Sequence, residues 1–464
     1  MERRRSERAW MLAAGAGLAA GLAGGGCESA MPRISDLSGT YIAALCDADM
    51  PATAFADGRL GARDANAADS LTVVMLPIVE PVTPHAQVGV SNSAFGLPHC
   101  LAVSADGRLA FAVETRGPAD ARAATTNDLP AGSVLTAIDL SEPLRPEISA
   151  ILKLSDEPTS VDVHPSGDFL AVSTKGARRQ VAIVPLKGQG FGEPMLFPLM
   201  GTDDEGTAPG VVVWHPSGAY LAVTMPALGQ VALYQFIREP DGSAISLARW
   251  GDPVRVGKYP GAARFTPDGK HLLVSCLNWG EDVPGFLVGA PEGDMVLVRL
   301  SDVPSTLPGE DGAPAPRAEH AVTASAKTGI SPEGFAVSPD GRYIVTANVR
   351  RAFLPESDER FTRGGSLSLL YLNERESDLY LAGEFPLDAL PQGVAFDPRG
   401  RFVVVSLFSS YDPSDVDGEL GFWHLTKGRD ARLDEVMETD AATGETYSVR
   451  VGVGKGPHGV LIVR

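Results

Sequence analysis

Short apolar runs separated by sharp turns recur along most of this 464-residue chain. Each unit begins with a proline and small residues, continues as an apolar strand, turns at Pro-Asp-Gly, Pro-Ser-Gly or a close variant, and ends in a second apolar strand. Proline presets φ in such a turn and glycine accepts positive φ, so the pattern predicts a β-hairpin. The full units are LPHCLAVSADGRLAFAV from Leu97, EPTSVDVHPSGDFLAVS from Glu157, APGVVVWHPSGAYLAVT from Ala208, YPGAARFTPDGKHLLVS from Tyr259, SPEGFAVSPDGRYIVTA from Ser331 and LPQGVAFDPRGRFVVVS from Leu390.

The spacing of these units indicates a repeat architecture. A truncated seventh unit, GPHGVLIVR, ends at Arg464, and the unit prolines are Pro98, Pro158, Pro209, Pro260, Pro332, Pro391 and Pro457. Further apolar runs predict third strands from Gly132, Arg179, Gly229, Gly293, Ser366 and Glu419, followed by shorter and more variable fourth strands. Four strands in a period of roughly 50 to 70 residues are typical of a β-propeller.

The two ends of the chain complement each other. The seventh unit has a first strand but no following hairpin, whereas SGTYIAALC from Ser38 reads as a second strand and DSLTVVML from Asp69 as a third. Pairing them removes the free edges that an open ring exposes. We therefore predict an all-β, seven-bladed β-propeller with four strands per blade, whose last blade is closed by N- and C-terminal strands.

The units resemble the YVTN-type repeats and the related lactonase-like seven-bladed propellers. The resemblance covers nearly all of the chain after about residue 38. It implies the fold and leaves the function open, because this scaffold serves both enzymes and binding modules.

The first 26 residues have the pattern of an export signal. Four arginines precede an uncharged apolar run from Ala9 to Ala23, and three glycines lead into Cys27. The run is too short and too rich in glycine and alanine to form a stable membrane-spanning helix. The segment resembles a bacterial lipoprotein signal, which implies lipidation of Cys27, although Gly24 stands where that family usually has leucine. The alternative is an ordinary cleaved signal.

These features divide the chain into a signal peptide (1–26), a lipid-anchored tether (27–37) and the propeller (38–464). We expect an exported, monomeric protein that faces the periplasm or the cell exterior and touches the membrane only through its lipid. The formal net charge is −19, and the net charge of residues 1–26 is positive. An acidic chain of this kind disfavours nucleic acid as a partner, because phosphate backbones are bound through Lys and Arg.

Few cysteines remain after Cys27, so the fold does not depend on a network of disulfide bonds. Cys46 and Cys276 occupy equivalent positions in distant blades, which argues against a bridge between them. Cys46 with Cys100 is the better pair, and three unpaired thiols are the alternative.

The candidate chemistry lies directly after the unit prolines, at one mouth of the central channel. The residues there are His99, Thr159, Gly210, Gly261, Glu333, Gln392 and His458. His99 and His458 belong to neighbouring blades. With Glu333 and an arginine, Arg350 or Arg116, such residues suit acid–base chemistry on a lactone, as the resemblance implies. The alternative is that they are solvated or satisfy backbone groups.

The ends of the second strands add a second set of candidates: Glu114, Cys276, Asn278 and Asn348. Their oxygen ligands suit calcium, but we predict no metal or other cofactor. The acidic loop 409–419 (SSYDPSDVDGE) lacks EF-hand spacing and reads as a solvated turn. A long loop brings Trp279 and Phe286, which either rim a binding site or pack on their own blade.

The chain lacks the GxSxG, HExxH, GxxxxGK[ST] and CxxCH motifs. His164, His215 and His271 lie in or beside turns and are expected to be structural. The leading hypothesis is a non-catalytic module that binds a small molecule or a protein, with Thr159, Gln392, Asn278, Asn348 and Trp279 as contacts. The alternative is a lactonase-like enzyme that uses His99, Glu333, His458 and Arg350.

Overall fold

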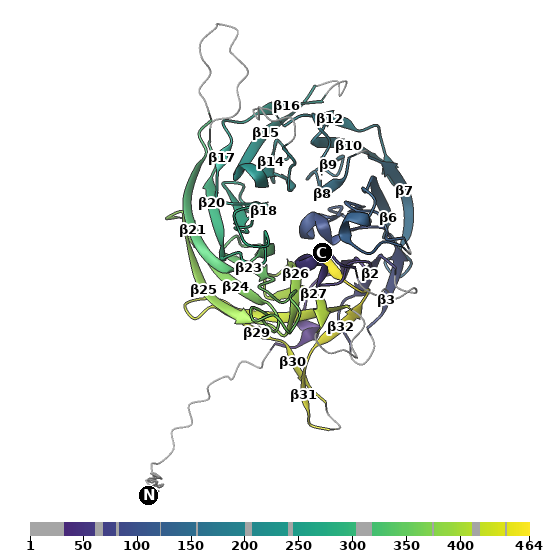
Figure 1. The fold of residues 1–464 in the computed structure, drawn as a ribbon, viewed down its shortest axis with the longest axis vertical. Helices are drawn as coiled ribbons and strands as arrows, with labels where there is room; N and C mark the ends of the chain where they lie inside the picture. Colours follow the sequence, from purple (N-terminus) through teal and green to yellow (C-terminus); the bar gives the residue numbers. More distant parts are fainter. Residues whose placement is uncertain are drawn as a thin grey trace, which may run out of the picture. The chain divides into compact units, whose positions relative to one another are not determined.

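Seven antiparallel sheets form a closed ring in the computed structural model of this chain (Figure 1). The structure describes residues 32–60, 68–79, 83–120, 122–154, 156–199, 207–239, 245–302, 318–373, 375–410, 418–440 and 443–464. Residues Arg33–Arg464 form one compact unit. The predicted signal and Cys27 lie outside the described residues. Within the described part of the chain, no helix has the length and apolar character needed to cross a membrane.

Each blade is one sheet whose first strand lines the channel and whose fourth lies at the rim. Blade one contains β4 (Leu101–Val103), β5 (Leu109–Val113), β6 (Val134–Asp139) and β7 (Glu147–Lys153). Blade two contains β8 (Pro158–Val163), β9 (Phe169–Thr174), β10 (Val181–Lys187), β11 (Gly190–Phe191) and β12 (Met195–Phe197). Blade three contains β13 (Val212–Trp214), β14 (Tyr220–Met225), β15 (Gln230–Arg238), β16 (Ile245–Arg249) and β17 (Val254–Arg255).

The remaining blades repeat this order. Blade four contains β18 (Pro260–Phe265), β19 (His271–Cys276), β20 (Glu292–Arg299) and β21 (Ala321–Ile330). Blade five contains β22 (Pro332–Val337), β23 (Tyr343–Asn348), β24 (Ser366–Asn373) and β25 (Asp378–Pro386). Blade six contains β26 (Ala389–Phe396), β27 (Phe402–Ser410), β28 (Gly418–Thr426), β29 (Arg432–Glu435) and β32 (Arg450–Val453).

Blade seven confirms the predicted closure. Its order from the channel outward is β33 (Pro457–Val463), β1 (Tyr41–Cys46), β2 (Ser70–Met75) and β3 (His85–Gly89). Tyr41 is paired with Val463 on one side and with Met75 on the other. The C-terminal strand therefore supplies the inner strand of a blade whose other strands come from the N-terminal region.

The predicted turns also form. In the hairpin of blade four, Gly269 has φ 71° and its N–H donates to the Thr266 carbonyl. A Cβ there would lie 2.5 Å from Nε2 of His215, so this position requires glycine for both its conformation and its close approach. Nε2 of His215 donates to the Gly269 carbonyl at 2.8 Å, and Nε2 of His164 donates likewise to Gly218 at 3.0 Å. These two histidines tie neighbouring blades together, as their predicted structural role requires.

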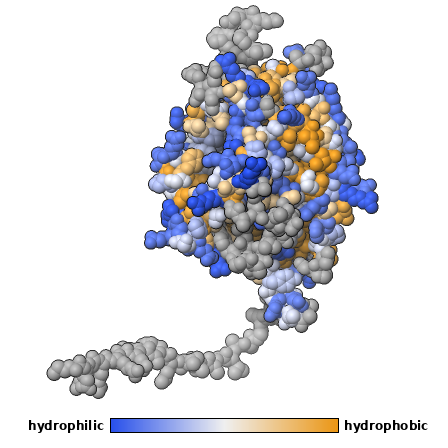
Figure 2. Space-filling model, turned by 45° about the vertical axis from the view of Figure 1, so that its right-hand side comes forward, coloured by the Kyte–Doolittle hydropathy of each residue, from blue (hydrophilic) through white to orange (hydrophobic). Residues whose placement is uncertain are grey.

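The blade interiors and the rim differ in the expected way. The second strands are almost wholly buried, for example β9 and β19, whereas the rim strand β7 alternates between exposed and half-buried side chains. Apolar side chains therefore appear among polar ones on the outer surface near β7 and β12, where Ile151 is 62% exposed (Figure 2). The fourth strands are the variable edge strands that the pattern predicts.

Several short elements had no counterpart in the predicted repeat. They are η1 (Ile34–Asp36), α1 (Ala54–Asp57), η2 (Ala94–His99), η3 (Thr126–Asp128), η4 (Pro226–Leu228) and the hairpin of β30 (Met437–Thr439) with β31 (Thr446–Ser448). The hairpin projects from the rim beside β29 (Figure 1). Of these elements, η2 matters most for the channel.

The three described cysteines, Cys46, Cys100 and Cys276, are buried and form no disulfide bond. The alternative without a bridge is therefore confirmed, and the predicted Cys46–Cys100 disulfide is wrong. Burial raises the pKa of both Cys46 and Cys276 to about 12, so these thiols are protonated and unreactive in the folded protein.

Candidate functional site

The 3₁₀ helix η2 lies inside the ring, at the end of the channel where the inner strands begin. It contacts β8, β18, β22 and β33, which belong to four different blades, and it is visible as a blue coil within the ring (Figure 1). Pro98 of η2 packs against blade five, since a Cβ on Gly334 would lie 2.9 Å from its ring. The N–H of Ala94 donates to the Asp47 carboxylate at 2.8 Å, which fixes the start of η2.

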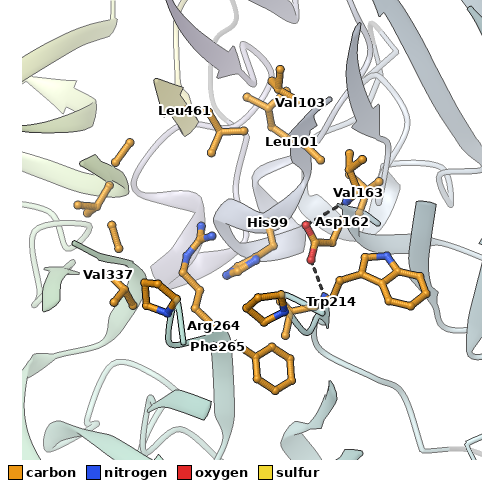
Figure 3. A pocket seen from close by; sticks show the side chains of 18 residues that line it. His99, Leu101, Val103, Asp162, Val163, Trp214, Arg264, Phe265, Val337 and Leu461 are labelled. Carbon is orange, nitrogen blue, oxygen red and sulfur yellow. Dashed lines mark hydrogen bonds between the residues drawn. The ribbon is translucent and has the colours of Figure 1, made fainter. Parts of the chain in front are cut away.

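A cavity of about 400 Å³ occupies the channel on the other side of η2 (Figure 3). The inner strands of all seven blades line it, and Pro216 and Pro267 of the hairpin turns also contribute. We call it the central cavity. Most of the residues that line it are Ala, Val or Leu, and three have ionisable side chains: His99, Asp162 and Arg264.

Arg264 supplies the positive charge of the central cavity. It lies on β18 and is only half-buried, because its side chain faces the cavity. Its Nε donates to the Phe335 carbonyl at 2.9 Å, which orients the guanidinium. Burial lowers the pKa of Arg264 and the charge of Asp162 opposes that effect, but a guanidinium remains protonated in a protein.

Asp162 lies on β8 and is held by backbone donors. Its Oδ2 accepts from the Trp214 N–H at 2.6 Å, and its Oδ1 accepts from the Val163 N–H at 3.0 Å. Burial raises the pKa of Asp162 to about 6, against the opposing effects of the Trp214 hydrogen bond and the Arg264 charge. The carboxyl therefore changes its charge in mildly acidic solution.

His99 ends η2 and reaches the cavity from that side, between Arg264 and Asp162 (Figure 3). Burial and, to a smaller extent, the Arg264 charge hold the pKa of His99 well below its usual range. The imidazole is therefore neutral at pH 7. A fixed cation, a neutral imidazole and a carboxylate at one cavity suit a small organic anion that also carries a hydroxyl group.

Of the predicted catalytic residues, the structure places only His99 at the central cavity. Glu333, Gln392 and His458 are buried at the strand starts and do not line it. Nε2 of His458 lies 2.7 Å from Oδ1 of Asn92. Burial raises the pKa of Glu333 to about 8 and lowers that of His458 to about 3.

The predicted arginines lie elsewhere. Arg350 is half-buried beyond β23, outside the lining of the central cavity. Arg116 forms an ion pair with Glu157, with 3.0 Å between Nη1 and Oε1. Glu114 accepts from the Ser133 N–H at 3.1 Å. The cation at the cavity is instead Arg264.

The predicted ligand contacts make internal hydrogen bonds. Thr159 donates to the Gly210 carbonyl at 2.8 Å, which links blades two and three. Asn348 is fully buried and donates to two serine hydroxyls of β24. Asn278 donates to the Glu292 carbonyl at 2.7 Å.

Trp279 is buried, and its Nε1 donates to the Ser331 hydroxyl at 2.9 Å. Its ring packs near Tyr259 and Phe286, with centroid distances of 5.2 and 6.3 Å. Of the two alternatives for this loop, Trp279 therefore follows the second, because its ring packs on its own blade. Phe286 remains 40% exposed.

The sequence contained a signal for the two residues that were missed. The fourth residue after each unit proline is Ala102, Asp162, Val213, Arg264, Ala336, Ala395 or Leu461. Asp162 and Arg264 are thus the two charged members of an otherwise apolar set. A comparison of the seven units at this position would have identified Asp162 and Arg264 as candidate site residues.

No metal site is evident in the part of the chain that the structure describes: no group of three or more His, Cys, Asp or Glu side chains is arranged to hold an ion. The acidic side chains Asp412, Asp415 and Asp417 lie outside the described residues. Glu419, at the end of that loop, lies 3.8 Å from Arg450.

Comparisons with known proteins show the fold. No family model matches the chain, and no curated relative was found. Among solved structures, the periplasmic gluconolactonase of Pseudomonas aeruginosa matches with TM-score 0.57 and 16% identity, over 92% of this chain and 99% of the other. A proposed 6-phosphogluconolactonase of Bacteroides fragilis matches with TM-score 0.57 and 13% identity, over 92% and 98%. A hypothetical selenium-binding protein of Sulfolobus tokodaii matches with TM-score 0.55 and 12% identity, over 91% and 93%.

Proposed function

We propose that this chain binds a small organic anion, such as a hydroxy acid or sugar acid, in the central cavity. The observation that carries the proposal is Arg264, a half-buried guanidinium that faces the central cavity. Partial burial shields this group from solvent, so its charge-assisted hydrogen bond to a carboxylate is stronger than one formed in water. His99 and Asp162 lie at the same cavity and offer hydrogen-bonding partners for the hydroxyl groups of the ligand.

A second candidate function is hydrolysis of a lactone in the same cavity. The neutral imidazole of His99 favours it, since such a group can accept a proton from attacking water. Opening of a lactone by water gives a hydroxy acid, whose carboxylate would then face Arg264. The structural likeness to a gluconolactonase supports this candidate at the level of the fold.

One experiment separates the two functions. The soluble chain from Glu28 is titrated calorimetrically with gluconate, galactonate and lactate, and the matching lactones are followed in a pH-stat. We expect carboxylate binding without acid release from the lactones. Acid release that disappears in His99→Ala would replace binding by hydrolysis, and no binding of any carboxylate or lactone would overturn the proposed function.

We further propose that residues 1–26 are an export signal and that Cys27 carries a lipid, which makes the protein a membrane-anchored lipoprotein. The basic start, the apolar run and the small residues before Cys27 support this. In a bacterial host, we expect the full chain to incorporate labelled palmitate and to fractionate with membranes. Cys27→Ser should lose both properties, and equal labelling of the two proteins would contradict the proposal.

A further inference from the structure

The central cavity contains two opposite charges that are not paired with each other. Arg264 on β18 and Asp162 on β8 both face it, and His99 lies between them (Figure 3). Among the described residues, Asp162 accepts hydrogen bonds only from two backbone N–H groups, and Arg264 donates only to one backbone carbonyl. Neither charge is therefore neutralised by contact with an opposite side chain.

The two groups are nevertheless close enough to influence each other. The Arg264 charge opposes the rise that burial causes in the pKa of Asp162, and the Asp162 charge opposes the fall that burial causes in the pKa of Arg264. The imidazole of His99 adds no charge at pH 7, because burial and the Arg264 charge lower its pKa. No other ionisable side chain lines the cavity, so it presents one positive and one negative group.

This pair of charges treats two kinds of carboxylate ligand differently. A carboxylate at Arg264 also meets the negative field of Asp162, and a hydroxyl group elsewhere on the ligand does little to offset that repulsion. An ammonium group offsets it, because it is positively charged and donates charge-assisted hydrogen bonds. The two Asp162 oxygens each accept one backbone N–H and keep further lone pairs for such donors.

We propose that the central cavity prefers a carboxylate ligand that also carries an ammonium group, as a small amino acid does, and that Asp162 determines this preference. The carboxylate lies at Arg264 and the ammonium group at Asp162. The inference rests on the proposed carboxylate site at Arg264 and specifies the other end of the ligand.

The test is calorimetric titration of the soluble chain from Glu28 with three pairs of ligands that differ only in an amino or a hydroxyl group. The pairs are alanine with lactate, β-alanine with 3-hydroxypropionate, and γ-aminobutyrate with 4-hydroxybutyrate, in which the distance between the two ends increases. At pH 7.5 we expect the amino acid of at least one pair to bind at least about fivefold more tightly than its hydroxy acid, because a hydrogen bond between charged groups is the stronger one.

Asp162→Asn should change the two affinities of that pair in opposite directions. The hydroxy acid should bind more tightly because the repulsion is removed, and the amino acid should bind more weakly because its ammonium group loses the carboxylate. A variant that only damages the cavity would weaken both ligands. Asp302→Asn, the same change at an exposed position after β20, should leave the preference unchanged.

Because the amide in Asp162→Asn has one acceptor oxygen for two backbone N–H groups and the variant can fail to fold, the unsubstituted protein at pH 5 gives a second measurement. Burial raises the pKa of Asp162 to about 6, so its carboxyl is mainly protonated at pH 5. The ligands remain charged, and Arg264 and His99 keep their states. The preference for the amino acid should therefore fall between pH 7.5 and pH 5.

The possible results separate this inference from the proposed function. Hydroxy acids that bind as tightly as the amino acids in all three pairs would overturn the preference and leave the carboxylate site at Arg264 in place. A preference that is the same at pH 5 and pH 7.5 would show that Asp162 does not determine it. If none of the six compounds binds, the proposed function itself is overturned.

Discussion

Replacing Arg264 with glutamine is expected to weaken binding of a carboxylate ligand by about ten- to a hundredfold. A hydrogen bond to a charged group contributes about 1.5–3 kcal/mol, and glutamine keeps a donor but loses the charge. Arg264→Lys should recover only part of the affinity, because an ammonium cannot reproduce the planar fork of the guanidinium. Calorimetry at pH 7 on the folded variants measures both effects.

The matched control is Arg255→Gln, which removes the same charge from an exposed side chain of β17. It should leave carboxylate affinity within about twofold, since exposed charges are screened by solvent and salt. If Arg255→Gln weakens binding as much as Arg264→Gln does, the effect comes from net charge. The central cavity would then not be the binding site.

Glu333→Gln is expected to raise the free energy of unfolding at alkaline pH and to change that free energy much less at pH 5. Burial raises the pKa of Glu333 to about 8, above its value in the unfolded chain. Between these two values the folded state holds the proton that the unfolded state has released, so stability falls as pH rises. At about 1.4 kcal/mol per pH unit, the loss from pH 5 to pH 8 is on the order of 3 kcal/mol.

Urea unfolding of the two proteins at pH 5, 6.5 and 8 measures this difference. Asp69 and Asp162, whose pKa values burial raises to about 8 and about 6, have the same sign of effect, but they are present in both proteins and cancel in the comparison. Glu147→Gln, on the exposed start of β7, is the control and should follow the unsubstituted protein at every pH. If the difference in unfolding free energy between Glu333→Gln and the unsubstituted protein does not grow with pH, Glu333 is ionised in the folded state.

The fold could be predicted because each blade repeats the same local chemistry. The turn glycines, the apolar second strands and the third strands all follow from patterns within a single unit. The closing blade was also predictable, since the seventh unit lacks what the segments from Ser38 and Asp69 provide. The hairpin of β30 and β31 was not, because it interrupts one blade only and has no counterpart in the other units.

The site was harder to predict because two positions of the repeat lie in different parts of the channel. The first residue after each unit proline lies at the strand start, whereas the fourth lies farther along the strand, where it can line the central cavity. The strand starts are irregular, with register shifts after Pro158 and Pro332, so simple alternation does not assign their directions. η2 also covers that end of the channel, and the segment Ala94–His99 has no equivalent in the repeat. His99 was predicted correctly because it follows a unit proline and also ends η2, which brings it to the central cavity.

The pairing of β1 with β33 has a consequence for the order of events during biosynthesis. Residue 41 meets residue 463, so this contact spans nearly the whole length of the chain. A chain made from its N-terminus can form six blades in succession, but β1 and β2 have no inner neighbour until β33 has been made. Contacts between such distant segments form slowly, which makes closure the natural final step of folding. Until β33 pairs with β1, the ring has a gap at blade seven.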